Sequence, residues 1–196
     1  SNDTVYTVTV DGVTVTDEWM NEMIAGDPEK RNIWAKVIQR RGEIGYPYIF
    51  FKDKANKGAA DVYQDNNLNI NASNLCTEIM LPTNDKWSFV CVLSSVNLLH
   101  YEKWKETDAV ETMVYFLDAV ITEFLDKLDV YRDSDDREDR QTFLFMERAY
   151  NFAKENRALG LGVLGWHSLL QSKKLAFNSQ GSYDLNTEIF KFIKEK

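Results

Sequence analysis

Cysteine, histidine and proline are scarce in this chain of 196 residues, which holds two, two and three of them. Two cysteines, Cys76 and Cys91, cannot form a disulfide framework in a chain of this size. The two histidines stand far apart in sequence, and neither an H-E-x-x-H nor a C-x-x-C spacing occurs. Zinc sites are built on such spacings, so we expect no metal site.

Basic residues are also in deficit. The chain has 23 lysines and arginines against 31 acidic residues, a formal net charge of -8. Nucleic-acid phosphates and anionic membrane surfaces require a basic face, so neither is an expected partner. No apolar run approaches the ~20 residues that span a bilayer. The polar start "SNDTVYTVTV" lacks a signal pattern, and we therefore expect a cytoplasmic protein.

What the chain does have is core-forming material. Its hydrophobic fraction is 44% and its aromatic fraction 13%, as in globular proteins. A chain of this length can bury a core of its own without dividing. We predict one domain over residues 1–196.

Alternating β-branched residues and helical spacings outline an α/β pattern. Asp11-Gly12 predicts a β-hairpin over residues 1–16. Helices are expected from Thr16 to about residue 23, from Asp27-Pro28 to about residue 41, and over 108–129, 141–156 and 184 onward. Short apolar runs predict strands at 46–51, 75–81 and 87–93, and the Asn-rich and Gly-rich stretch 54–74 predicts a loop.

Gly160, Gly162 and Gly165 match the dinucleotide-binding spacing G-x-G-x-x-G, with Asp184 downstream. That site needs a strand directly before the first glycine, whereas "FMERAYNFAKENR" has a helical pattern. We prefer the interpretation that the glycines let a strand pack closely against its neighbours, and NAD binding is a minor alternative.

Asn74, Cys76 and Glu78 stand at i, i+2 and i+4 in "SNLCTEI". If this stretch is extended, the three side chains share one face, which suits a site that presents an amide, a thiol and a carboxylate to one small ligand. From spacing alone, however, the favoured interpretation is that Cys76 is a small core residue, as a cysteine beside leucines usually is.

The blocks "RGEIGYPYIFFKDKAN", "SNLCTEI" followed by "LPT", "CVLSSVNL" and "RALGLGVLGWHSLLQSK" occur in one order. Together they resemble the large, catalytic subunit of class I ribonucleotide reductase, in its bacteriophage and bacterial forms. The resemblance implies an α/β fold, namely part of a ten-stranded barrel, with a finger loop at about residues 65–81. It covers about residues 33–196 and suggests a middle slice of that subunit.

This resemblance implies a role for each candidate residue. Cys76 would carry a thiyl radical that takes a hydrogen atom from C3′ of a ribonucleoside diphosphate. Glu78 would be the base on the 3′-hydroxyl, and Asn74 its hydrogen-bonding neighbour. Cys91 would be one member of the redox pair that supplies two electrons.

The resemblance also implies partners: the rest of the large subunit, a small radical-generating subunit and thioredoxin or glutaredoxin. No cofactor would bind this chain itself, since the metal-radical cofactor belongs to the small subunit. The other redox cysteine and the shuttle cysteines have no counterpart in this sequence. The chain alone is therefore expected to be inactive, and a non-catalytic remnant or assembly partner in a split reductase is the alternative.

Overall fold

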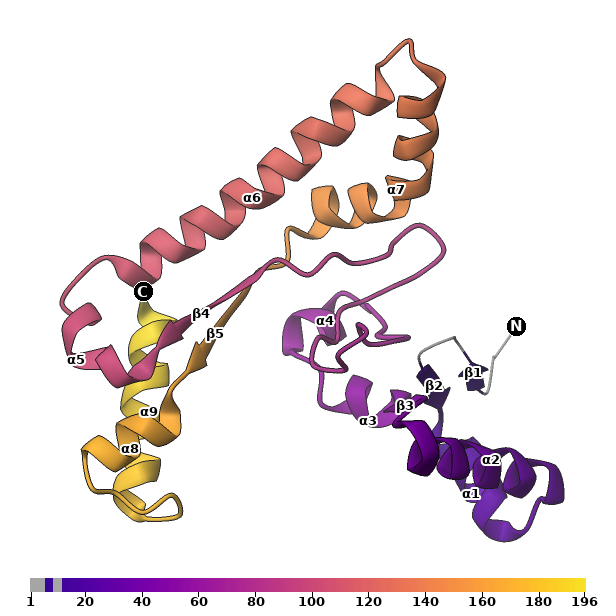
Figure 1. Cartoon of the computed structure of the whole chain (residues 1–196), viewed down its shortest axis with the longest axis horizontal. Coiled ribbons are helices and arrows are strands. Elements are labelled where there is room, and N and C mark those ends of the chain that lie inside the picture. Colours follow the sequence, from indigo (N-terminus) through magenta and orange to yellow (C-terminus); the bar gives the residue numbers. More distant parts are fainter. Residues whose placement is uncertain (1–5, 9–11) are drawn as a thin grey trace. The chain divides into compact units, whose positions relative to one another are not determined.

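The computed structural model describes residues 6–8 and 12–196, with side chains from residue 12 onward. The chain forms two compact units, residues 1–89 and 90–196, which Figure 1 colours in sequence order. The single domain predicted for residues 1–196 stays a prediction. The first unit holds, in chain order, β1 (Tyr6–Val8), β2 (Gly12–Val15), α1 (Asp17–Ala25), α2 (Pro28–Ile44), β3 (Tyr48–Phe51), α3 (Lys52–Lys57) and α4 (Asp61–Asp65).

A three-stranded sheet in the order β1-β2-β3 is the centre of the first unit. β1 pairs antiparallel with β2, and β2 pairs parallel with β3, with Gly12 opposite Tyr48. The antiparallel strands of the predicted hairpin are thus confirmed. Residues 1–5 of that prediction, and 9–11 including Asp11, lie outside the described residues.

The two helices after β2 begin where the sequence predicts. The Thr16 hydroxyl accepts a hydrogen bond from the Trp19 amide (3.2 Å), and the Asp27 carboxylate accepts from the Glu29 and Lys30 amides (3.0 Å each). Such caps satisfy amides that the first helical turn leaves unpaired. α2 runs to Ile44 and ends at Gly45 in the left-handed conformation, so it continues beyond the predicted end at residue 41.

One face of the sheet packs on these helices. Val13 and Val15 of β2 are buried with Trp19 and Val37, and Ile49 of β3 packs against them. Because side chains alternate along a strand, the residues between them point to the opposite face. The sheet is therefore covered by helices on one side, and its other side faces the segment that follows α4.

That segment differs from the prediction in two ways. The expected loop 54–74 contains most of α3 and the whole of α4, and residues 66–92 contain neither helix nor strand. The strand predicted at 75–81 is wrong, because the Asn74 side chain binds the amides of Glu78 and Ile79 and closes this stretch into a turn. The strand predicted at 87–93 overlaps the observed one only at Leu93.

The second unit holds, in chain order, β4 (Leu93–Asn97), the 3-10 turn η1 (Leu98–His100), α5 (Tyr101–Trp104), α6 (Ala109–Arg132), α7 (Arg137–Asn156), β5 (Gly160–Leu164), α8 (Trp166–Ser172) and α9 (Gln180–Glu195). β4 and β5 pair in parallel, with Leu93 opposite Gly160. α8 and α9 pack with η1 and α5 around Leu98, Tyr101 and Ile189, all buried.

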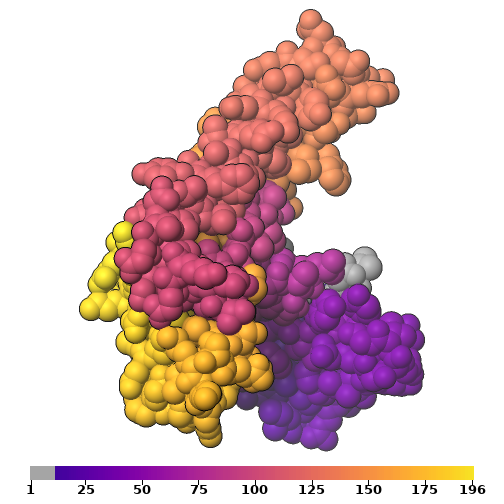
Figure 2. Space-filling view, turned by 60° about the vertical axis from the view of Figure 1, so that its left-hand side comes forward, coloured from indigo at the N-terminus to yellow at the C-terminus, as the bar shows by residue number. Residues whose placement is uncertain are grey.

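α6 and α7 form a helical hairpin that projects from the rest of the second unit (Figures 1 and 2). The predicted helix at 108–129 is confirmed. α7 begins at Arg137 rather than 141, because Asp136 caps it, and α9 begins at Gln180 rather than 184, because Ser179 caps it. Leu128, Phe143 and Tyr150 form the buried contact between α6 and α7. No helix in the described part of the chain is both long and apolar enough to cross a bilayer.

Candidate functional site

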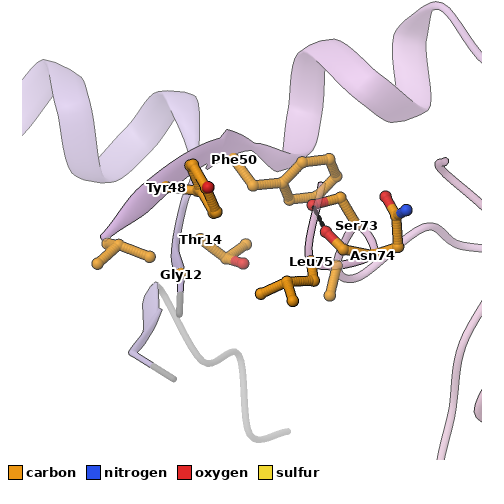
Figure 3. Close-up of a pocket in the computed structure, with 9 residues that line it drawn as sticks. Gly12, Thr14, Tyr48, Phe50, Ser73, Asn74 and Leu75 are labelled. Carbon is orange, nitrogen blue, oxygen red and sulfur yellow. Dashed lines mark hydrogen bonds between the residues drawn. The ribbon is translucent and has the colours of Figure 1, made fainter. Parts of the chain in front are cut away.

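A cavity of about 200 Å³ lies on the face of the sheet that the helices leave open. Gly12 and Thr14 of β2 and Tyr48 and Phe50 of β3 line one side of it, and residues 72–75 line the other. Figure 3 shows side chains of both strands facing the loop. The finger loop predicted at about residues 65–81 stays a prediction.

Hydrogen bonds tie the two arms of this loop together at its base. The Thr83 amide donates to the Asn69 carbonyl (3.2 Å), and the Asn71 side chain donates to the Thr83 carbonyl (2.6 Å). Asn56 of α3 donates to the Ile70 carbonyl and accepts from the Ile70 amide, both at 2.8 Å. Loops whose ends meet in this way are compact and are frequently functional.

At its tip the loop closes into a tight turn from Asn74 to Ile79. The Asn74 amide donates to the Ile79 carbonyl (3.2 Å). The Asn74 side-chain oxygen accepts from the amides of Glu78 (3.2 Å) and Ile79 (3.0 Å). A short polar side chain can bind backbone amides that a neighbouring strand would otherwise bind. Here the Asn74 side chain determines the turn in this way.

The expected extended conformation of residues 73–79 is therefore wrong, and the alternation argument for a shared face does not apply. The structure instead brings Asn74, Cys76 and Glu78 together within one closed turn. Cys76 and Glu78 are both exposed, whereas Asn74 is half-buried. The alternative that Cys76 is a buried core residue is contradicted by its exposure in this chain.

The other cysteine of the chain is Cys91. It is exposed and belongs to the second unit, two residues before β4. Its predicted redox role stays a prediction. The described residues contain no group of three His, Cys, Asp or Glu side chains placed to hold a metal ion.

The glycine motif has a structural explanation. A Cβ on Gly160 would lie 3.1 Å from the Leu93 Cβ, and one on Gly162 would lie 3.3 Å from the Ser95 hydroxyl. Both glycines belong to β5, so the motif begins inside a strand, which follows the helix α7. The interpretation that the glycines allow close packing of a strand is confirmed.

Some residues of the site were missed in the sequence. Asn56 and Asn71 secure the base of the loop, yet they stand in an Asn-rich stretch whose composition predicts only a loop. Thr14, Tyr48 and Phe50 line the cavity, and their alternation with Val13 and Ile49 is the signal that could have found them.

We expect Asn74→Ala to loosen the turn without unfolding the first unit. The substitution removes two hydrogen bonds that are each worth roughly 0.5–1.5 kcal/mol. Hydrogen exchange at the Glu78 and Ile79 amides should accelerate by about 5- to 100-fold, measured by NMR. Asn74→Asp keeps the accepting oxygen and is the matched control, expected to retain protection. Equal exchange rates in Asn74→Ala and the unsubstituted chain would contradict this account of the turn.

Comparison with known proteins gives consistent matches. A family model described as the ribonucleotide reductase barrel domain matches residues 10–196. The ribonucleoside-diphosphate reductase large subunit of Invertebrate iridescent virus 3 is 35% identical, over 82% of this chain and 24% of its own length. The subunit alpha of Chlamydia muridarum is 31% identical, over 78% of this chain and 13% of its own length.

A solved structure is also similar. The class Id ribonucleotide reductase alpha subunit of Actinobacillus ureae superposes with a TM-score of 0.73 at 50% identity, over 94% of this chain and 33% of its own. The predicted fold class, an α/β barrel fragment, is confirmed by the family match and this superposition. The chain spans a third or less of the length of each of these relatives.

Proposed function

Because this chain belongs to the ribonucleotide reductase barrel-domain family, we propose that it carries the radical thiol and the general base of a ribonucleotide reductase catalytic subunit. The reaction converts a ribonucleoside diphosphate into its 2′-deoxy form and supplies precursors for DNA synthesis. Cys76 holds the thiyl radical, Glu78 is the base, and Asn74 shapes the turn that presents both.

The observation that carries this proposal is the turn closed by Asn74. Its side-chain oxygen binds the amides of Glu78 and Ile79, so it fixes the backbone on the far side of Cys76. A sulfur and a carboxylate two residues apart, both exposed on one tied loop, can approach neighbouring positions of the same sugar. Holding reacting groups in such an arrangement removes much of the entropic barrier to reaction.

The chemistry follows from the groups at this tip. The Cys76 sulfur takes a hydrogen atom from C3′ of the ribose and later returns one. Glu78 accepts the proton of the 3′-hydroxyl at hydrogen-bond distance, which favours loss of the 2′-hydroxyl as water. Two electrons and the balancing protons come from a dithiol of which Cys91 is one member, and that dithiol becomes a disulfide.

The proposal includes the partners expected of such a subunit. These are the remainder of the large subunit, a small subunit whose metal-radical cofactor would supply the radical that Cys76 holds, and thioredoxin or glutaredoxin to reduce the disulfide. This chain itself would bind no cofactor, and the assembled protein would act in the cytoplasm.

We expect the isolated chain to show no sustained reduction of ribonucleotides. The proposed cycle needs a radical thiol and two reducing thiols, and this chain has only Cys76 and Cys91. The assay combines the chain with a small subunit, a reductant and ribonucleoside diphosphates, and measures deoxynucleotide by chromatography. A complete large subunit in the same mixture is the positive control. Repeated turnover by the isolated chain would contradict this thiol count.

A further inference from the structure

Thr77, between Cys76 and Glu78, has an unusual backbone conformation. Its φ is +66°, in the left-handed region. The other described residues with positive φ are glycines and Asn67, Arg157 and Lys174, so Thr77 is the one β-branched residue among those described. Crowding at Cβ makes this conformation unfavourable for a β-branched side chain, whereas glycine and asparagine adopt it readily.

The Thr77 side chain is also unsatisfied. Its hydroxyl oxygen is buried and has no hydrogen-bond partner among the described residues. The Thr77 amide is used, because it donates to the Asn74 carbonyl (3.1 Å). Buried hydroxyl groups are nearly always hydrogen-bonded, so an exception calls for a physical explanation. At a position suited to glycine, the chain therefore carries a residue that is costly in both its backbone and its side chain.

The adjacent residue has the complementary group. The Glu78 amide is bound by Asn74, but its carboxylate is exposed and makes no hydrogen bond or ion pair with the described residues. A hydroxyl is a donor, and an ionised carboxylate is an acceptor whose hydrogen bonds are stronger than those between neutral groups. The flexible Glu78 side chain can turn back toward its neighbour when a ligand covers the loop tip.

We propose that Thr77 is a positioning residue of this site. With a ribonucleotide bound, its hydroxyl donates a hydrogen bond to the Glu78 carboxylate and holds that carboxylate beside the Cys76 thiol. This inference rests on the proposed function, since it assigns Thr77 to the same reaction. It accounts for a hydroxyl at a position where the backbone favours glycine, and for the lack of a partner to that hydroxyl among the described residues.

The test uses a complete large subunit carrying this segment, assayed with its small subunit and reductant. Thr77→Val replaces the hydroxyl with a methyl group of similar size and retains the branch at Cβ. We expect kcat to fall by about 10- to 100-fold with KM within about twofold, because the carboxylate is misplaced rather than the substrate lost. Thr77→Ser restores a hydroxyl and should keep kcat within about threefold of the unsubstituted protein.

Thr77→Gly provides an independent check, since it relaxes the backbone but supplies no hydroxyl. We expect a loss of kcat similar to that of Thr77→Val. The melting temperature of Thr77→Val should not fall, because the change removes an unpaired buried hydroxyl. If Thr77 had only a structural role, a variant with a lower kcat would also have a lower melting temperature.

The possible results separate this inference from the proposed function. Unchanged kcat in Thr77→Val or Thr77→Gly, an effect on KM alone, or a loss in Thr77→Ser as large as in Thr77→Val would overturn the role of the hydroxyl. In those cases the proposed function would still stand if the unsubstituted enzyme is active and the Glu78→Gln variant is inactive. Full activity in Glu78→Gln would overturn both.

Discussion

Replacing Cys76 with alanine in a complete large subunit is expected to abolish deoxyribonucleotide formation, by at least about 10⁴-fold in kcat. Cys76 is the one cysteine of this loop, so no other side chain at its tip can carry the radical. The fold should be unaffected, since the Cys76 side chain is exposed and such substitutions usually change stability by less than about 0.5 kcal/mol. Turnover and circular dichroism together check both parts.

Two further substitutions make this result specific. Glu78→Gln removes the base and keeps the size of the side chain, so we expect a smaller loss of about 10²- to 10⁴-fold. Met80→Ala, at an exposed position just beyond the closed turn, is the matched control and should retain activity. An active Cys76→Ala variant would refute the proposed radical site.

Gly165→Ala is expected to destabilise the second unit by about 2–4 kcal/mol, because two costs act together. Gly165 has φ +77°, which disfavours any side chain. A Cβ there would also clash with the Asn97 side-chain oxygen. That oxygen accepts a hydrogen bond from the Leu99 amide (3.0 Å) and so caps η1, which would be lost if Asn97 moved. Urea denaturation followed by circular dichroism measures the change.

Gly42→Ala is the matched control for this prediction. Gly42 lies inside α2, is exposed, and has nothing within 4 Å of an added Cβ. Alanine favours the helical state, so this substitution should stabilise the first unit by roughly 0.5–1 kcal/mol. Equal effects of the two substitutions would contradict the close approach of Gly165 and Asn97.

Local signals in the sequence predicted the helices well. Thr16 and Asp27 fix helix starts through their own side chains, and the apolar spacing of α6 is long enough to be unambiguous. Boundaries were missed where a cap lies outside the apolar pattern, as at Asp136 and Ser179. The short helices α3 and α4 have no side-chain cap, so nothing in the sequence distinguished them from a loop.

The candidate site was found through its motif, whereas its conformation was not. The order of blocks around Cys76 identified the family, which the matches confirm. The strand-like pattern of residues 73–79 was misleading, because Asn74 satisfies backbone groups that a neighbouring strand would otherwise bind. A side chain that closes its own turn leaves no periodic signal, so only the structure shows it.

The parallel pairing of β4 and β5 constrains how the second unit is made. The whole of α6 and α7 lies between these strands in the sequence, so β4 leaves the ribosome long before its partner exists. At synthesis rates of 5–20 residues per second, the wait is about 3 to 13 seconds. An apolar strand that has no pairing partner is prone to aggregate with other chains. β4, with the sequence Leu-Ser-Ser-Val-Asn, is mostly polar. The newly synthesised β4 thus exposes few apolar side chains to water until β5 has been made and can pair with it.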